Sequence, residues 1–566
     1  MSPDKIRGVL LADFNIQNLA GYLNNNADLP ETQVKSAPFG QVVPALMNAG
    51  DALWRENPDF AVIWARPESI FPAFQQALNY MPPQVEKILA EVDEFSVLLL
   101  NLRGRVKTVF IMQWVYPTWH RGLGVMDLKT GVGISNLLMQ MNLRLADNLQ
   151  DRAEFIVLPV QKWLEMTGPS AFNSKLDYMG KIAFANPVFA LAARDIKAGL
   201  RAVSGQARKL ILLDLDDTLW GGIVGDLGWE KIRLGGHDPV GEAYVDFQKT
   251  LQALSRRGIV LGLVSKNEES IALEAIEKHP EMVLKTDNFA GWRINWQDKA
   301  QNIVDLVRDL NLGLQSVVFI DDNPVERARV REALPEALVP EWPADPMLYK
   351  SALLSLNCFD TLATSSEDLG RTEMYVSERK RKTLLEKMES LDDWLHTLEM
   401  QVTIQPLTEV DLARTAQLLN KTNQMNLSTR RLTEPELAAW VAQPGNRLWT
   451  CRVSDKFGDS GLTGIVSMTV TANQGQIVDF ILSCRVMGRK VEETMIYTAI
   501  DYARSLGLQQ VCARYLPTAK NKPCLSFLQN SGMTYREDNV YCWDTGMGYP
   551  VPAHINLKLL PGDAHD

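Results

Sequence analysis

The segment Lys209-Leu-Ile-Leu-Leu-Asp-Leu-Asp-Asp-Thr-Leu-Trp-Gly-Gly222 joins an apolar run to carboxylates and glycines. The apolar residues suit a central strand of a parallel sheet, and ligands of such sheets bind beyond the carboxyl ends of the strands. Side chains alternate along an extended segment, so Asp214 and Asp216 point the same way while Leu215 points back into the protein. One carboxylate could attack phosphorus while the other moves a proton, and both suit Mg²⁺. The segment therefore indicates phosphoryl transfer; the plainer alternative is a strand that ends in a polar helix cap.

Three later segments each place a polar group where phosphate chemistry needs one. A second apolar strand leads into Ser265, whose hydroxyl suits a phosphate oxygen. Lys299 lies near the start of a predicted helix and supplies a cation for the phosphoryl charge. A third apolar strand ends in Asp321 and Asp322, a costly pair unless a cation or hydrogen bonds satisfy it. Taken singly, Ser265 is more often a strand-end cap and Lys299 a solvated helix residue.

In this order the segments resemble the motifs of the haloacid dehalogenase (HAD) superfamily. The resemblance implies that Asp214 is the nucleophile and Asp216 the acid/base. It also implies that the phosphate is bound by Thr218, Ser265 and Lys299, and that Mg²⁺ is held by Asp214, Asp216, Asp321 and Asp322.

The composition is that of a globular chain with several domains. A length of 566 residues suggests about three to four domains, and 46% hydrophobic with 22% charged residues argues against general disorder. The formal net charge of -10 argues against a general nucleic-acid binder. No apolar run approaches the roughly 18 to 20 residues of a membrane span, and residues 9–12 are too short for a signal-peptide core. We therefore expect a cytoplasmic enzyme whose cysteines stay reduced and which has no membrane partner.

Residues 1–200 alternate apolar strands with helical stretches, which predicts a separate flavodoxin-like sheet. We expect strands at residues 9–12, 60–64, 96–100, 108–112 and 154–158, and helices at residues 139–149 and 189–200. The first strand leads into Ala12-Asp-Phe-Asn15, where serine hydrolases of the SGNH type have Gly-Asp-Ser. The domain therefore resembles a degenerate SGNH domain, used for docking or positioning. Asp13, Asn15 and His120 could line a pocket, although solvated strand-end residues are the commoner case.

The phosphoryl-transfer domain is expected over residues 205–345. Residues 221–244, between its first two motifs, are too few for a large capping domain, so we expect an open pocket. Proline-rich residues 335–346 mark its exit. Residues 346–399 are then expected to be a linker with a charged helical segment.

Residues 400–552 are again mixed α/β, with a tail at residues 553–566. Strands at residues 464–471 and 476–484 precede Arg485-Val-Met-Gly-Arg-Lys490 and a helix at residues 491–505. This order of a strand, a glycine-containing turn and a helix resembles the coenzyme A site of GNAT-type N-acetyltransferases. In those enzymes backbone N–H groups at the start of the helix hold the pyrophosphate. Their turn usually ends in Gly or Ala, whereas Lys490 stands here and its side chain opposes close approach of pyrophosphate.

The FkbH-like proteins, HAD subfamily IIIC, resemble this chain over nearly its whole length. The matching segments are Leu213-Asp-Leu-Asp-Asp-Thr-Leu-Trp-Gly-Gly222, Phe319-Ile-Asp-Asp-Asn-Pro-Val-Glu-Arg327, Asn420-Lys-Thr-Asn-Gln-Met-Asn426, Lys456-Phe-Gly-Asp-Ser-Gly461 and Ser483-Cys-Arg-Val-Met-Gly-Arg489. The chain departs from many relatives at Asp217, Met425 and Lys490. The resemblance implies three α/β domains: a flavodoxin/SGNH-like sheet, a HAD Rossmann-like sheet and a GNAT-like mixed domain. It further implies Mg²⁺-dependent removal of phosphate from 1,3-bisphosphoglycerate, and loading of a glyceryl group onto a phosphopantetheinylated acyl carrier protein in polyketide-type biosynthesis.

Carrier loading would need a second site for the acyl group. An acyl phosphate is already activated, so a thiolate could take the glyceryl group directly. Cys484 is the candidate thiol, because the positive charges of Arg485, Arg489 and Lys490 would favour its thiolate and attract a phosphorylated donor. We expect Arg485 and Arg489 to be the residues that bind this substrate. A buried Cys is more often a small hydrophobe, and Cys524 is the next candidate.

Two other classes of function remain open from the sequence. One is a HAD phosphatase that acts on another phosphorylated acid or carrier-bound intermediate, with the C-terminal domain as a lid or docking surface. The other is an acyl-CoA-dependent acyltransferase in which the HAD domain activates or trims a precursor. Measurements of phosphate release, of acyl-enzyme formation and of acyl-CoA binding would distinguish these two functions from glyceryl transfer.

Overall fold

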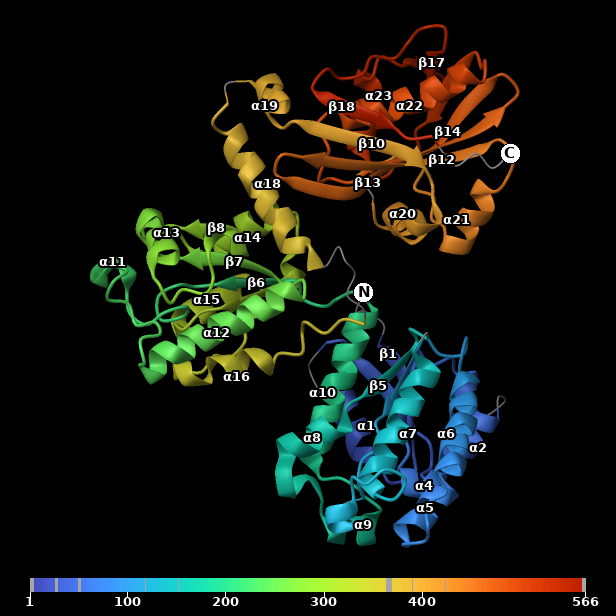
Figure 1. Cartoon of the computed structure of the whole chain (residues 1–566), viewed down its shortest axis with the longest axis vertical. Coiled ribbons are helices and arrows are strands. Elements are labelled where there is room, and N and C mark those ends of the chain that lie inside the picture. Colours follow the sequence, from blue (N-terminus) through green and yellow to red (C-terminus); the bar gives the residue numbers. More distant parts are fainter. Residues whose placement is uncertain are drawn as a thin grey trace. The chain divides into compact units, whose positions relative to one another are not determined.

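The chain folds around three sheets: a five-stranded parallel sheet, a four-stranded sheet and a nine-stranded mixed sheet (Figure 1). The computed structural model describes residues 5–25, 29–48, 52–117, 119–150, 152–362, 369–388, 390–422 and 424–561. They divide into two compact units, Met1–Leu284 with Arg293–Leu369 and Lys285–Trp292 with Gly370–Asp566. The predicted α/β fold class is confirmed. Within the described ranges, no helix is both long and apolar enough to span a bilayer.

The N-terminal sheet has the strand order β2-β1-β3-β4-β5, with all neighbours parallel. Its strands are β1 (Ile6–Ala12), β2 (Thr32–Ser36), β3 (Phe60–Trp64), β4 (Thr108–Met112) and β5 (Phe155–Leu158). Its helices are α1 (Gln17–Asn25), α2 (Val42–Met47), α3 (Ala52–Arg55), α4 (Pro67–Ile70), α5 (Pro72–Leu78), α6 (Val85–Leu100), α7 (Ile134–Leu149), α8 (Val160–Thr167), α9 (Ser174–Gly180) and α10 (Asn186–Val203). The strands are apolar on both faces because α1, α8 and α10 cover one face while α2, α6 and α7 cover the other.

The strand expected at residues 96–100 is wrong, because these residues form the last turns of α6. Ile88, Val92, Phe95 and Leu99 are buried at helical spacing, so the apolar run continues one face of a helix. A five-residue apolar run does not by itself distinguish the two periods.

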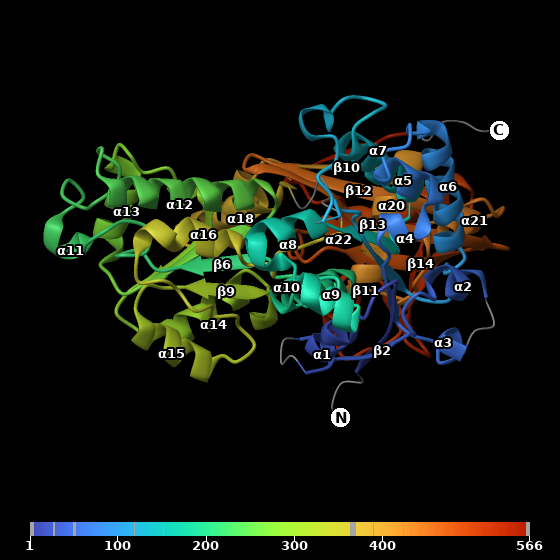
Figure 2. The same cartoon turned by 90° about the horizontal axis from the view of Figure 1, so that it is seen from below.

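The second sheet has the strand order β8-β7-β6-β9. Its strands are β6 (Leu210–Leu213), β7 (Val260–Ser265), β8 (Phe289–Ile294) and β9 (Val317–Ile320), and its helices are α11 (Val224–Leu227), α12 (Pro239–Arg256), α13 (Glu269–Lys278), α14 (Lys299–Asp309), α15 (Pro324–Ala333) and α16 (Tyr349–Leu354). Helices α12 and α16 lie on one side of β6 and β9, and α14 and α15 lie on the other (Figure 2). The strand that carries the first carboxylates is therefore central, as predicted.

The chain beyond residue 345 packs onto this domain where a linker was expected. Tyr349 is 2% exposed, and its ring lies 5.3 Å from that of Trp342 and 5.6 Å from that of Phe247. The main chain returns to the sheet as far as Cys358, whose carbonyl accepts a 2.8 Å hydrogen bond from Arg208 N. Burial of the aromatic rings explains why the domain continues past the proline-rich stretch.

The third sheet has the order β16-β17-β15-β14-β13-β12-β10-β18, with β11 paired to β14. Its strands are β10 (Met400–Pro406), β11 (Met425–Asn426), β12 (Asn446–Asp455), β13 (Gly458–Thr471), β14 (Gln474–Leu482), β15 (Gln510–Arg514), β16 (Thr534–Arg536), β17 (Val540–Asp544) and β18 (Ile555–Leu559). The helices of this part are α18 (Arg371–Leu385), α19 (Leu391–Thr397), α20 (Glu409–Lys421), α21 (Glu434–Val441), α22 (Val491–Ser505) and α23 (Lys522–Asn530). The expected tail at residues 553–566 contributes β18, which pairs in parallel with β10.

Two cysteines of this sheet are joined, in contrast to the expectation that all six stay reduced. Cys512 of β15 and Cys542 of β17 are directly opposite each other in the antiparallel register and form a disulfide. Their spacing of 30 residues gives no signal in the sequence, because only the strand pairing brings them together.

Candidate active site

Asp214 follows β6 directly, at the carboxyl end of the central strand. Its backbone N–H donates a 3.0 Å hydrogen bond to Ile320 O, so the main chain is still held by the sheet ladder at this point. The side chain is buried, and its Oδ1 has no hydrogen-bond partner among the residues that the structure describes. A buried carboxylate oxygen without a partner is costly, which marks it as an atom that awaits a ligand or a reacting group.

Lys299, the first residue of α14, reaches this carboxylate. Its Nζ lies 3.0 Å from Asp214 Oδ2 and 2.6 Å from Asp321 Oδ2, and its side chain is 4% exposed. Burial acts to lower the pKa of Lys299, but the charges of Asp214 and Asp321 outweigh it and hold the pKa above its ordinary value. The lysine is therefore a fixed cation that holds Asp214 Oδ2 while leaving Oδ1 free.

Three carboxylates form a group that could hold a metal ion. One oxygen from each of Asp214, Asp321 and Asp322 lies within 4.8 Å of the others. Burial, and then the charge of Asp214, raises the pKa of both Asp321 and Asp322 to about 6. Three close acidic side chains with one lysine carry excess negative charge, and oxygen ligands of this kind suit Mg²⁺. The Asp216 side chain lies outside this group.

Thr218 and Ser265 are the two hydroxyl residues that we expect to bind phosphate. The Thr218 hydroxyl accepts a 3.2 Å hydrogen bond from Asp322 N and donates a 3.3 Å one to Asp322 Oδ1, which ties the first motif to the last. Ser265 is the last residue of β7 and is buried. Both hydroxyls are thus held at the carboxyl edge of the same sheet as Asp214.

Asp216 is held by three hydrogen bonds, of which the sequence indicated none. Its Oδ1 accepts from Trp220 Nε1 at 2.9 Å and from Val224 N at 3.0 Å, and its Oδ2 accepts from Asn267 Nδ2 at 2.8 Å. Burial raises the pKa of Asp216, although these hydrogen bonds favour its ionised form. Asn267 lies in the turn that follows Ser265. Its position just after a strand is the one feature of the sequence that could have indicated a role in the site.

Asp217 carries the strained conformation of the first loop, with φ of 51°. Its carbonyl oxygen accepts hydrogen bonds from the hydroxyls of Tyr349 at 3.0 Å and Tyr244 at 3.3 Å, and its side chain accepts from Gly222 N at 2.7 Å. A non-glycine residue adopts this backbone conformation only where its surroundings hold it. The two tyrosines come from distant helices, so local sequence could not indicate them.

Cys484 lies two residues beyond β14 and is exposed. The other three free cysteines, Cys358, Cys451 and Cys524, are buried, and burial raises the pKa of Cys358 and Cys524 to about 12. Among the free cysteines Cys484 therefore has the accessible thiol, whereas the thiol of Cys524 is closed to a substrate.

The cations expected beside Cys484 are largely engaged. Arg489 is 3% exposed, and its Nη2 lies 2.7 Å from Glu378 Oε2 and donates to Arg485 O at 2.6 Å. Lys490 Nζ lies 3.3 Å from Asp392 Oδ1. Arg489 therefore serves the packing of this unit, which weakens its expected role as a substrate-binding residue.

The glycine turn before α22 is filled by the protein itself. Gly488 N donates a 3.1 Å hydrogen bond to Glu492 Oε1, and Lys490 adopts the left-handed conformation with φ of 62°. Glu492 is 4% exposed and burial raises its pKa to about 7. The Glu492 carboxyl group thus accepts a hydrogen bond from the Gly488 N–H, a backbone donor that a bound pyrophosphate would need.

The three polar residues singled out in the N-terminal domain have internal partners. Asp13 accepts hydrogen bonds from Arg66 and Ser69, Asn15 Nδ2 donates to Gly180 O, and His120 Nε2 lies 2.6 Å from Leu78 O. Asn15 and His120 therefore hold loops together, and a pocket in this region is lined by other residues.

A scan against protein-family models gives no match, and no curated protein matches the chain. Among solved structures, the N-terminal part of the protein BF1531 from Bacteroides fragilis, containing a phosphatase domain and complexed with Mg, is 30% identical. The match covers 63% of this chain and 95% of that chain with a TM-score of 0.58. The spermidine N-acetyltransferase from Vibrio cholerae in complex with CoA and spermine is 18% identical, over 26% of this chain and 96% of that chain, with a TM-score of 0.21.

Proposed function

The chain belongs to the same family as the N-terminal part of the Bacteroides fragilis protein BF1531, and we propose that it is a Mg²⁺-dependent phosphatase of the HAD type. The observation that carries this proposal is the pairing of a free, buried Asp214 Oδ1 with an Oδ2 held by Lys299. A carboxylate fixed in this way presents one oxygen for attack on phosphorus.

In the proposed reaction Asp214 Oδ1 attacks phosphorus, and the bond between phosphorus and the leaving oxygen breaks. Asp216 gives that oxygen its proton. Water then hydrolyses the aspartyl phosphate, with Asp216 as base, which releases phosphate and restores Asp214. Lys299, Thr218 and Ser265 would bind the phosphoryl oxygens.

Asp214, Asp321 and Asp322 fit a Mg²⁺ ion, because they offer close oxygen ligands with excess negative charge. When bound, the ion would offset the negative charge of the phosphoryl group. Lys299 alone cannot balance three carboxylates and a phosphate.

We further propose the finer function that the resemblance to FkbH-like proteins implies, a glyceryl transfer onto an acyl carrier protein. The Cys484 thiolate would attack the acyl carbon of 1,3-bisphosphoglycerate and form a 3-phosphoglyceryl thioester, and the bond from that carbon to the phosphate oxygen would break to release inorganic phosphate. The carrier thiol would then take the acyl group, and the HAD site would hydrolyse the remaining phosphate ester. The exposure of Cys484 supports this assignment over the buried Cys524.

An acyl-CoA-dependent reaction is the weaker alternative. The Gly488 N–H that could bind pyrophosphate is already bonded to Glu492, and Lys490 occupies the position usually taken by a small residue. A phosphatase acting on another phosphorylated acid remains the broader alternative.

Two measurements test the proposal. Phosphate release from small phosphate esters with Mg²⁺ tests the phosphatase assignment. Intact-mass analysis of the enzyme and a carrier protein, after incubation with 1,3-bisphosphoglycerate, tests the transfer. Phosphate release without any acyl adduct would leave a phosphatase and remove the glyceryl transferase.

A further inference from the structure

A pocket lies at the carboxyl ends of β3 and β4 in the N-terminal sheet, apart from the phosphoryl-transfer site. The chain runs from β1 to β2 on one side and then crosses to β3 on the other side, so the sheet reverses its winding between β1 and β3. Ligands of open α/β sheets bind beyond the carboxyl ends of the strands, and this pocket opens there at β3 and β4, next to the switch point. The pocket has an interior volume of about 40 Å³, room for about three water molecules.

Arg66 forms the polar end of the pocket and is fixed in place. Its backbone N–H and its Nε donate to the Asp13 carboxylate at 2.8 and 2.7 Å, and its guanidinium lies 5.6 Å from the centre of the Phe14 ring. Among the described residues neither Nη1 nor Nη2 has a hydrogen-bond acceptor. Asp177 Oδ1 is 4.0 Å from Nη1, and Glu68 Oε1 is 3.9 Å from Nε. The guanidinium therefore presents two free donors between two carboxyl groups.

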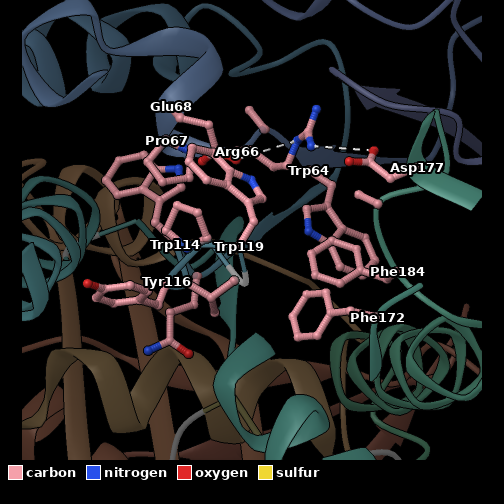
Figure 3. Close-up of a pocket in the computed structure, with 15 residues that line it drawn as sticks. Trp64, Arg66, Pro67, Glu68, Trp114, Tyr116, Trp119, Phe172, Asp177 and Phe184 are labelled. Atoms are coloured by element: carbon pink, nitrogen blue, oxygen red, sulfur yellow. Dashed lines mark ion pairs between the residues drawn. The ribbon is translucent and has the colours of Figure 1, made fainter. Parts of the chain in front are cut away.

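Aromatic rings form a large part of the remaining lining (Figure 3). Trp64 and Phe184 stack with ring centres 5.0 Å apart, and Phe172 lies 5.5 Å from Phe184. Trp119 is 67% exposed, so the face of its indole ring is open to a ligand.

The charges of the pocket favour a neutral ligand. An anion at Arg66 would meet the carboxylates of Asp13, Glu68 and Asp177, three negative groups against one positive. A cation at the same donors would meet Arg66. Burial already raises the pKa of Glu68, so additional negative charge is disfavoured here. A group that both accepts and donates hydrogen bonds meets these demands.

We propose that this pocket binds a carbohydrate, with neighbouring hydroxyls between Arg66 and Asp177 and the sugar ring against Trp119. A hydroxyl is both donor and acceptor, so one can accept from Arg66 Nη and the next can donate to Asp177. A hydroxyl group is also about the size of a water molecule, so two or three hydroxyls fit the small interior of the pocket. Phe14 stands where hydrolases of the SGNH type have their serine, so the role that we propose for the pocket is binding.

The test is titration of the full-length protein with D-glucose, D-galactose and N-acetyl-D-glucosamine by calorimetry, with acetate and choline as charged comparators. At least one sugar should bind, and more tightly than acetate or choline. Asp177→Asn and Trp119→Ala should each weaken it about tenfold, because each removes a contact to the sugar. Tyr178→Ala is the matched control, since Tyr178 is 80% exposed on the same helix as Asp177 and does not line the pocket.

Three results would each overturn the proposal: no saturable binding of any of the sugars up to its solubility limit, tighter binding of acetate or choline, or sugar binding unchanged in both pocket variants. Both substituted side chains are partly exposed, so the variants should fold. Their circular dichroism and phosphate-releasing activity check this.

Discussion

Asn267 donates a 2.8 Å hydrogen bond from its Nδ2 to Oδ2 of Asp216. The bond connects the turn after β7 to the loop after β6, and it fixes the carboxyl group that we assign as acid and base. Trp220 and Val224 hold the other oxygen. The position of the proposed acid is therefore set in part by a residue in the turn after the neighbouring strand.

Asn267→Ala should lower kcat by about 10- to 100-fold for an alkyl phosphate, whose leaving oxygen needs a proton. The loss should be smaller for p-nitrophenyl phosphate, because its leaving group is stable as an anion. Steady-state kinetics on both substrates measure the difference. Lys266→Ala is the control, since Lys266 Nζ pairs with Glu326. Equal losses on the two substrates would show that Asn267 has only a structural role.

Asp214→Asn should abolish phosphate release while the protein stays folded, because the shape of the side chain is kept and the nucleophilic charge is lost. Removal of divalent cations with EDTA should also abolish activity, and Mg²⁺ should restore it. A phosphate assay and a thermal melt together check both statements. Turnover near that of the parent, in the variant or in EDTA, would contradict the HAD assignment.

The strand ends that carry the candidate motifs could be predicted because each motif is local. An apolar run that ends in Asp214 or Asp321 identifies a strand end, and parallel strands bring their carboxyl ends to one edge. The supports could not be predicted in the same way. Tyr349 is 132 residues from Asp217 in the chain, and the engagement of Arg489 by Glu378 spans 111 residues. Contacts of this kind depend on packing between elements, which periodicity does not encode.

Tyr349→Ala should destabilise the unit that holds the catalytic sheet by about 3 to 5 kcal/mol, because it removes a buried aromatic ring. Tyr349→Phe keeps the ring and loses the hydrogen bond to Asp217 O, so it should cost about 1 kcal/mol. Met347→Ala, in the same segment but with Met347 54% exposed, should change little. Urea unfolding measures all three. A stability of Tyr349→Ala equal to that of the control would mean that the segment is the linker first expected.

Glu492→Gln should change how stability depends on pH. Burial raises the pKa of Glu492 from 4.5 to about 7, so the folded state binds a proton more tightly than the unfolded state. The stabilisation from this proton is present below pH 4.5 and is lost as pH rises from about 4.5 to 7, a difference of up to about 3 kcal/mol. The variant should be more stable than the parent at pH 8, with less of this dependence. Glu434→Gln, at an exposed glutamate in the first turn of α21, is the control for unfolding at pH 5 and pH 8.

The acyl-transfer step that we propose uses Cys484, which is the exposed member of the four free cysteines. If the enzyme takes the acyl group onto its own thiol, Cys484→Ala should eliminate both the acyl-enzyme mass shift and carrier loading. Hydrolysis of a simple phosphate ester should continue, because Asp214 and its partners belong to another unit of the chain. Cys524→Ala should load the carrier normally, since that thiol is buried. Intact-mass spectrometry with 1,3-bisphosphoglycerate and a carrier protein measures both steps. Loading that survives Cys484→Ala would place the acyl site elsewhere, and loading without any acyl-enzyme would indicate direct transfer to the carrier.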